Sequence, residues 1–153
     1  MTVSQYANDF FVYHKELCQF LLSIKKNCQE NNSTKIASIY LEIDLVDPLV
    51  LFSRILKVNQ LNFYWENKAN QESIVAIDAV INKELSGVER FISAEKFIKK
   101  CIDSINIFSP GNLSRSRPYF LCSFSFFSEN FQCNYPFPPA NIFLPKWQIN
   151  VNK

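Results

Sequence analysis

The chain has 153 residues, of which 48% are hydrophobic and 20% are charged, values that predict one ordinary globular domain. Sixteen lysines and arginines against 14 aspartates and glutamates give a formal net charge of +2. These charges are scattered along the chain, so nothing favours binding to nucleic acid or to a membrane surface. Gly87 and Gly111 are the only glycines, which excludes the glycine-rich loops that bind dinucleotides or nucleoside triphosphates.

Histidine and cysteine usage limits the chemistry further. His14 is the only histidine, so a histidine-rich zinc site is excluded, and its place in a helix near apolar residues favours a structural role. The cysteines form no C-x-x-C pair, and the spacing indicates no cysteine–histidine or serine–histidine–aspartate arrangement. We expect them to be small buried side chains in a reducing cytosol. They are Cys18, Cys28, Cys101, Cys122 and Cys133.

We expect a soluble cytoplasmic protein, because no secretory signal opens the chain and no apolar run of the sequence is long enough to span a bilayer. Hydrophobic spacing predicts a helix over residues 6–28, which the polar residues 29–33 end. A β-branched strand over residues 34–44 follows, with one covered face and another that is partly buried.

The next segment predicts a short helix and a hairpin. Asp47 and Pro48 mark a helix start, because aspartate accepts bonds from the free first-turn amides and proline is tolerated at the first helical position. This helix is expected to run to about Leu56. Strands over residues 60–66 and 74–81, with a turn at residues 67–70 between them, are expected to form the hairpin.

In the second half, Ser93 is a candidate cap for a helix over residues 93–106, and residues 109–118 read as a loop. The later elements are an aromatic strand at 119–127, a proline-stiffened connector at 135–139, and two strands at 142–147 and 148–151. The last strand runs almost to the terminus with no capping turn. We therefore expect an uncovered sheet edge, and the chain reads as unfinished.

Three groups of residues could carry chemistry, and each has a more ordinary explanation. Glu42 and Asp44 share one strand face as a general acid–base or metal-binding pair would, but carboxylates at a strand exit are commonly solvated. Lys96, Lys99 and Lys100 could bind an anion, although their spacing is typical of the solvent-exposed face of a helix. The aromatic residues could stack bases, but they lack a basic groove, so we expect a core. They are Phe63, Tyr64, Trp65, Phe120, Phe124, Phe126 and Phe127.

The residues alone thus predict an α+β domain without a recognisable site. Two segments carry a more specific signal: Phe63-Tyr64-Trp65-Glu66-Asn67-Lys68, and the run over residues 135–147 that reads YPFPPANIFLPKW. In this order and spacing they resemble the amino-terminal part of isochorismate synthases, most closely the cyanobacterial type, over essentially the whole chain. Many relatives carry glycine in the strands that correspond to residues 74–80 and 121–127, where this chain has Ala76, Asp78, Cys122 and Ser123.

The resemblance implies a partial chorismate-utilising-enzyme fold of the ADC synthase-like type, mostly an antiparallel sheet with flanking helices. Residues 1–153 would be a single incomplete unit that lacks the carboxy-terminal chorismate-binding part. Family members convert chorismate to isochorismate with a lysine base, a glutamate acid and Mg²⁺ held by further glutamates. All of those motifs lie beyond the equivalent of Trp147. The resemblance therefore assigns no catalytic, cofactor-binding or metal residue and no cofactor to this chain.

The leading hypothesis is an amino-terminal fragment of an isochorismate synthase in a menaquinone or phylloquinone pathway, inactive alone. Its expected partner is a chorismate-binding fragment, or a second copy through the exposed sheet edge, with no nucleic acid or membrane. A non-enzymatic binding module that kept the fold is the alternative. A catalytically independent enzyme comes third, and it would require an unrecognised site among Glu42, Asp44 and Lys146.

Overall fold

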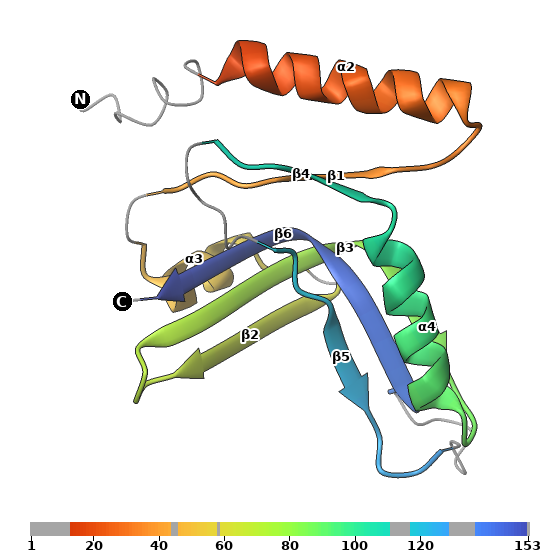
Figure 1. Cartoon of the computed structure of the whole chain (residues 1–153). Helices are drawn as coiled ribbons and strands as arrows, with labels where there is room; N and C mark the ends of the chain where they lie inside the picture. The colour runs from red at the N-terminus through yellow and green to blue at the C-terminus, as the bar shows by residue number, and fades with distance from the viewer. Residues whose placement is uncertain (1–12, 44–45, 58, 111–116, 129–136, 153) are drawn as a thin grey trace. The chain divides into compact units, whose positions relative to one another are not determined.

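The computed structural model describes all residues except 1–12, 44–45, 58, 111–116, 129–136 and 153. Internal contacts divide the chain into two compact units, residues 1–44 with 99–117 and residues 45–98 with 118–153. The elements follow one another as shown in Figure 1: α2 (His14–Glu30), β1 (Ile36–Ile39), α3 (Pro48–Ile55), β2 (Asn62–Asn67), β3 (Glu72–Leu85), α4 (Arg90–Ile102), β4 (Ile105–Phe108), β5 (Leu121–Phe124) and β6 (Ala140–Asn152).

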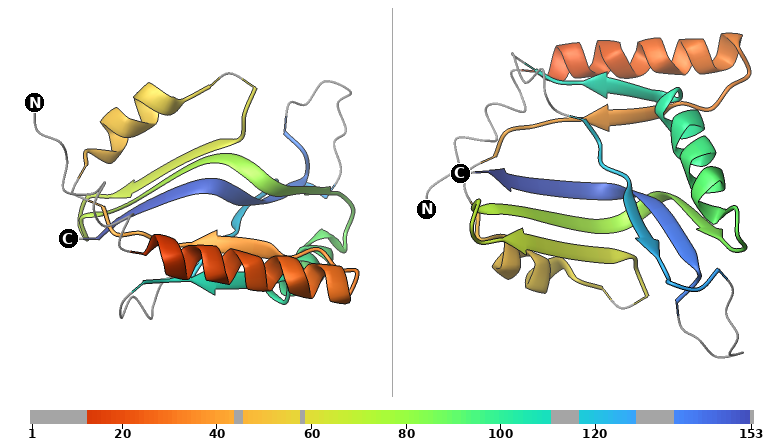
Figure 2. Two further views of the ribbon diagram at one scale, coloured as in Figure 1. Left: turned by 90° about the horizontal axis from the view of Figure 1, so that it is seen from above. Right: turned by 60° about the horizontal axis from the view of Figure 1, so that its bottom comes forward.

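The larger unit is built on a four-stranded sheet in the order β2-β3-β6-β5, in which every pair is antiparallel. The long strands β3 and β6 curve along their length (Figure 2). This arrangement confirms the prediction of an α+β chain with a mostly antiparallel sheet.

The β2–β3 hairpin forms at the predicted position. Asn67 pairs with Glu72, and the Asn67 Oδ1 accepts hydrogen bonds from the backbone N–H groups of Ala69 at 3.1 Å and Asn70 at 3.4 Å. An asparagine side chain that bonds the backbone two residues ahead is a standard way to start a turn. Gln71 closes the turn with φ of +54°, in the left-handed region.

The strand β6 corrects the prediction of two separate carboxy-terminal strands. Residues 140–152 form one continuous strand, although Pro145 lies within it. Proline cannot donate a bond to a neighbouring strand and is tolerated at bulges. Here Pro145 lies opposite Ala79, where the register with β3 shifts between Ala79 and Ile81, so the irregularity accommodates the missing donor.

The helix α3 confirms the start signal at Asp47. The Asp47 Oδ1 accepts bonds from the N–H groups of Leu49 at 2.9 Å and Val50 at 3.0 Å, and Pro48 is the first helical residue. The helix ends at Ile55, close to the predicted end.

The helix α4 begins three residues before the predicted helix and ends four residues before its predicted end. Ser93 is not a cap, because its N–H donates to the Glu89 carbonyl at 2.9 Å and the residue therefore lies inside the helix. At the other end, Ile105 belongs to β4, a strand that the sequence pattern did not predict.

The core of the larger unit forms where α4 covers the sheet, with Ala94, Ala140 and Ile142 packed against Leu85, Phe97, Ile98 and Phe120.

The smaller unit contains α2 and the parallel pair β1–β4, in which Ile36 lies beside Ile105 and Ile39 beside Phe108. The rings of Phe20 on α2 and Phe108 on β4 are 5.4 Å apart. The strand β1 is much shorter than the predicted strand over residues 34–44, and no residue of it is buried, so the expected covered face is wrong. A two-stranded parallel ladder has too few neighbours to bury either face.

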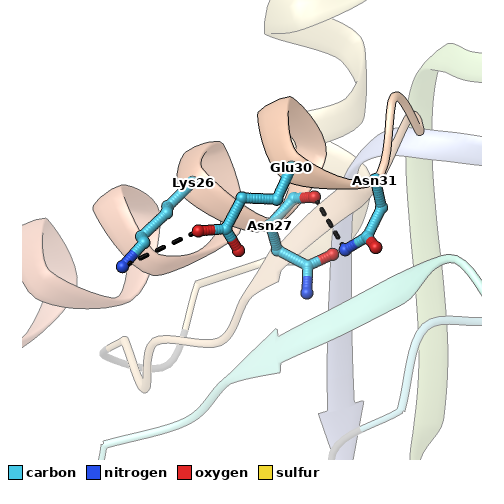
Figure 3. A network of polar contacts seen from close by, with 4 residues as sticks. All are labelled: Lys26, Asn27, Glu30 and Asn31. Atoms are coloured by element: carbon cyan, nitrogen blue, oxygen red, sulfur yellow. Dashed lines mark hydrogen bonds and ion pairs between the residues drawn. The ribbon is translucent and has the colours of Figure 1, made fainter.

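The helix α2 ends as predicted in the polar segment after residue 28, while residues 6–12 of the predicted helix lie outside the described residues. At this end the Asn31 Nδ2 donates to the Asn27 carbonyl at 3.1 Å, and Lys26 forms an ion pair with Glu30 at 3.8 Å (Figure 3). No residue of α2 is buried. Among the described helices, none is long and apolar enough to cross a membrane.

The strand β5 covers only the centre of the aromatic strand predicted over residues 119–127. The Ser125 N–H donates to the Pro139 carbonyl at 2.8 Å and its Oγ to the Phe127 carbonyl at 2.5 Å, which turns the chain after Phe124. The connector at 135–139 is described only from Phe137, and the loop at 109–118 only at its ends, where no helix or strand occurs.

Candidate functional site

The carboxylates suggested by the sequence do not form a described site. Glu42 is exposed and lies after the end of β1, and Asp44 lies outside the described residues. Among the residues that the structure describes, no group of three or more histidine, cysteine, aspartate or glutamate side chains could hold a metal ion.

The three lysines lie on α4, and all of them are exposed. Lys99 and Lys100 occupy its last turn, where cations interact favourably with the negative end of the helix dipole. This placement agrees with the solvated helix face that the spacing favours.

The predicted aromatic core forms only in part: Phe120 packs against the buried cluster, whereas Trp65, Phe124, Phe126 and Phe127 are exposed. Tyr64 of β2 packs against Phe52 of α3, with ring centroids 5.6 Å apart, and Phe124 of β5 stacks on Phe91 of α4 at 4.7 Å. Phe126 is 92% exposed and Phe127 lies against it edge to face. The physical reason is the early end of β5, which leaves the following phenylalanines outside the sheet.

Lys146 meets a carboxylate that the sequence pattern did not connect with it. Its Nζ lies 3.6 Å from Oδ2 of Asp78, across the β3–β6 pair. Asp78 has φ of +59°, and its Oδ1 accepts a bond from the N–H of Ala79 at 2.8 Å. Both side chains are partly exposed, and the pair lies next to the strand irregularity at Pro145.

Arg90, the first residue of α4, is a second feature that the sequence did not predict. It is only 6% exposed, and its guanidinium donates to the carbonyls of Gly87 at 3.3 Å, Ser125 at 3.1 Å and Phe126 at 3.4 Å. It also lies 4.4 Å above the Phe91 ring. Arg90 therefore connects the start of α4 to the segment after β5. No local sequence signal separates such an arginine from an exposed one at a helix start.

The cysteines correct a second sequence-based prediction, because only Cys101 is buried among the four that the structure describes. Burial raises the pKa of the Cys101 thiol, which the charge of Lys100 partly opposes. Cys18 and Cys122 are exposed, Cys28 is half-buried, and Cys133 lies outside the described residues.

His14 is exposed rather than packed among apolar side chains, and it lies next to Cys18. The Cys18 Sγ is 3.7 Å from Nε2 and 3.9 Å from Nδ1 of the imidazole. The prediction that the spacing indicates no cysteine–histidine arrangement overlooks this pair, although the two residues are four apart in a predicted helix. That spacing places two side chains on one helix face and is the signal that could have found them.

One side of β6 carries no paired strand over much of its length. The strand β5 pairs only with residues 140–143, so residues 144–152 have no strand beside them on that side among the described elements of the sheet. We refer to residues 144–152 on this side as the open flank of β6. The Gln148 side chain on this stretch accepts a bond from the Tyr119 N–H at 3.2 Å, and Trp147 is 66% exposed.

These features define an α+β chain organised around a curled antiparallel sheet, with one of its long central strands open along part of its length. Residues 23–153 match the family model described as chorismate binding enzyme, so the chain belongs to the chorismate-binding enzyme family. No curated protein and no solved structure shows significant similarity to the chain.

Proposed function

We propose that this chain is the amino-terminal part of an isochorismate synthase, the enzyme that converts chorismate to isochorismate for menaquinone or phylloquinone, and that it is inactive alone. The family match over residues 23–153 carries this proposal. The resemblance of two ordered sequence segments to isochorismate synthases supports the finer assignment.

The positions of those two segments in the sheet support their use as one unit. Phe63-Tyr64-Trp65-Glu66 lies on β2, and Leu144-Pro145-Lys146-Trp147 lies on β6. Both strands pair with β3, where Trp65 lies beside Ile74 and Trp147 beside Ile77. Segments that are far apart in the sequence thus flank one central strand.

The open flank of β6 supports a chorismate-binding fragment as the partner. Unpaired backbone groups on a strand, next to exposed aromatic surface, favour the addition of another strand. Trp147 and Tyr119 supply exposed aromatic surface there. In this proposal, the partner supplies the lysine base, the glutamate acid and the Mg²⁺ ligands, and this chain supplies the sheet to which the partner binds.

Co-expression with a chorismate-binding fragment from a close relative tests the proposal. We expect a soluble complex that converts chorismate in the presence of Mg²⁺. Trp147→Asp should weaken the complex at least tenfold, because it places a charge on the contact surface. Trp65→Asp is the matched control, since Trp65 is exposed on the edge strand β2, which is separated from β6 by β3, and the change should leave the complex intact.

Two results would contradict this proposal. The first is turnover by this chain alone. The second is failure of any chorismate-binding fragment to form a complex while this chain sediments as a compact monomer without dye-accessible apolar surface. The second result would favour the alternative of a self-sufficient binding module.

A further inference from the structure

We propose that His14 and Cys18 form a two-residue binding site for a borderline-soft divalent cation of the Zn²⁺ class on the first turns of α2. This site lies on a different element from the open flank of β6, and it is independent of the proposed function. The imidazole and the thiol are already adjacent, with the Cys18 Sγ 3.7 Å from the His14 Nε2.

The separation of the two donor atoms agrees with the geometry of a zinc centre. Zinc–sulfur bonds are about 2.3 Å long and zinc–nitrogen bonds about 2.0–2.1 Å, so a tetrahedral angle places the two ligand atoms about 3.6 Å apart. The observed separation of 3.7 Å between Sγ and Nε2 is close to this value, and the separation of 3.9 Å to Nδ1 shows that the sulfur is nearly equidistant from the two ring nitrogens. The imidazole must therefore turn so that one nitrogen points at an ion shared with the sulfur, and both side chains are exposed at the helix surface, where they can turn.

Access and ligand number determine the kind of site. Both side chains are exposed, so an ion can reach them from solvent, and water would fill its remaining positions. The thiol binds as the thiolate, so its proton is released to solvent as the metal–sulfur bond forms. With half the ligands of a structural zinc site, we expect a dissociation constant of about 10⁻⁶–10⁻⁴ M.

The start of α2 has little other support. The residue before it, Tyr13, makes no side-chain capping bond, and no residue of the helix is buried. An ion that links His14 to Cys18 would join the first and second turns of the helix. Binding should therefore increase the helical content of the chain as well as occupy the thiol.

Titration of the full chain with Co²⁺ tests the site, because thiolate coordination gives a charge-transfer absorption band. We expect a saturable band that Zn²⁺ removes by competition. Cys18→Ser should abolish the band, and His14→Ala should weaken Co²⁺ binding at least tenfold. Cys28→Ser is the matched control, since Cys28 lies on the same helix with no histidine one turn away.

A second measurement on the unmodified chain avoids any effect of substitution on folding. Zn²⁺ should slow alkylation of Cys18 at least fivefold relative to Cys28, as read by peptide mapping, and should raise the far-ultraviolet helical signal. A cobalt band that persists in Cys18→Ser would overturn the proposal. An affinity unchanged by His14→Ala, or equal protection of Cys18 and Cys28, would do the same.

Discussion

Asp78 shows how one residue can adapt a strand to an irregular register. Its backbone has φ of +59°, a conformation that glycine adopts without strain and aspartate tolerates better than most residues. Its side chain compensates through the bond to the Ala79 N–H and the ion pair with Lys146.

Substitution of Asp78 should reveal this conformation. We expect Asp78→Gly to change the free energy of unfolding by less than about 1 kcal/mol, because relief of backbone strain offsets the lost contacts. Asp78→Val should cost about 2 kcal/mol or more, since a β-branched residue fits the left-handed region poorly. Urea denaturation of both variants measures the difference.

Glu84→Val is the matched control for Asp78→Val. Glu84 is also an acidic residue of β3, and it is exposed, but its φ lies outside the left-handed region. Valine suits a strand, so this control should be close to neutral. Equal losses in the two valine variants would show that the conformation of Asp78 has no special effect.

At the scale of elements, α3 depends on its first residues. The helix spans Pro48–Ile55, and the Asp47 side chain satisfies the free N–H groups of Leu49 and Val50 in its first turn. We expect Asp47→Ala to lower the free energy of unfolding by about 1 kcal/mol. Asp47→Asn keeps a capping oxygen and should retain most of the stability. A similar loss in both variants, measured by urea denaturation, would contradict a capping role.

Elements with local signals were predicted well from the sequence. The cap at Asp47 and the turn at Asn67 depend on residues within three positions, so a short sequence window contains the cause. The strand β4 was missed because Ile105 continues the apolar spacing of α4. In the structure, the Ser104 N–H and Oγ both bond to the Cys101 carbonyl and end the helix before it.

The candidate sites were harder to predict because they depend on contacts between distant segments. The continuity of β6 through Pro145 depends on a register shift in β3, and the burial of Arg90 depends on carbonyls more than thirty residues away. No short window contains these causes. His14 and Cys18 are the exception, since their spacing of four on one helix was visible in the sequence.

At the scale of the molecule, Arg90 and Lys146, two cations of the larger unit, already have partners within the chain. Arg90 donates to backbone carbonyls, and Lys146 lies against Asp78. Chorismate is a dianion and requires cationic or metal partners for tight binding. We therefore expect calorimetric titration of the chain alone with chorismate and Mg²⁺ to give no binding above a weak, non-specific level.

The same titration of the complex with a chorismate-binding fragment is the positive control, and it should give a clear heat of binding. A dissociation constant in the micromolar range for the chain alone would contradict the prediction. It would indicate that this chain contains a complete anion site.

The parallel pairing of β1 with β4 has a consequence for folding during synthesis. Ile36 cannot meet Ile105 until β2, β3 and α4 have left the ribosome, a delay of several seconds at roughly 5–20 residues per second. The β2–β3 hairpin needs no such delay, because its strands are joined by a short turn. The nascent chain should therefore form the hairpin first. Until β4 is synthesised, the backbone groups of β1 stay unpaired and accessible to chaperones.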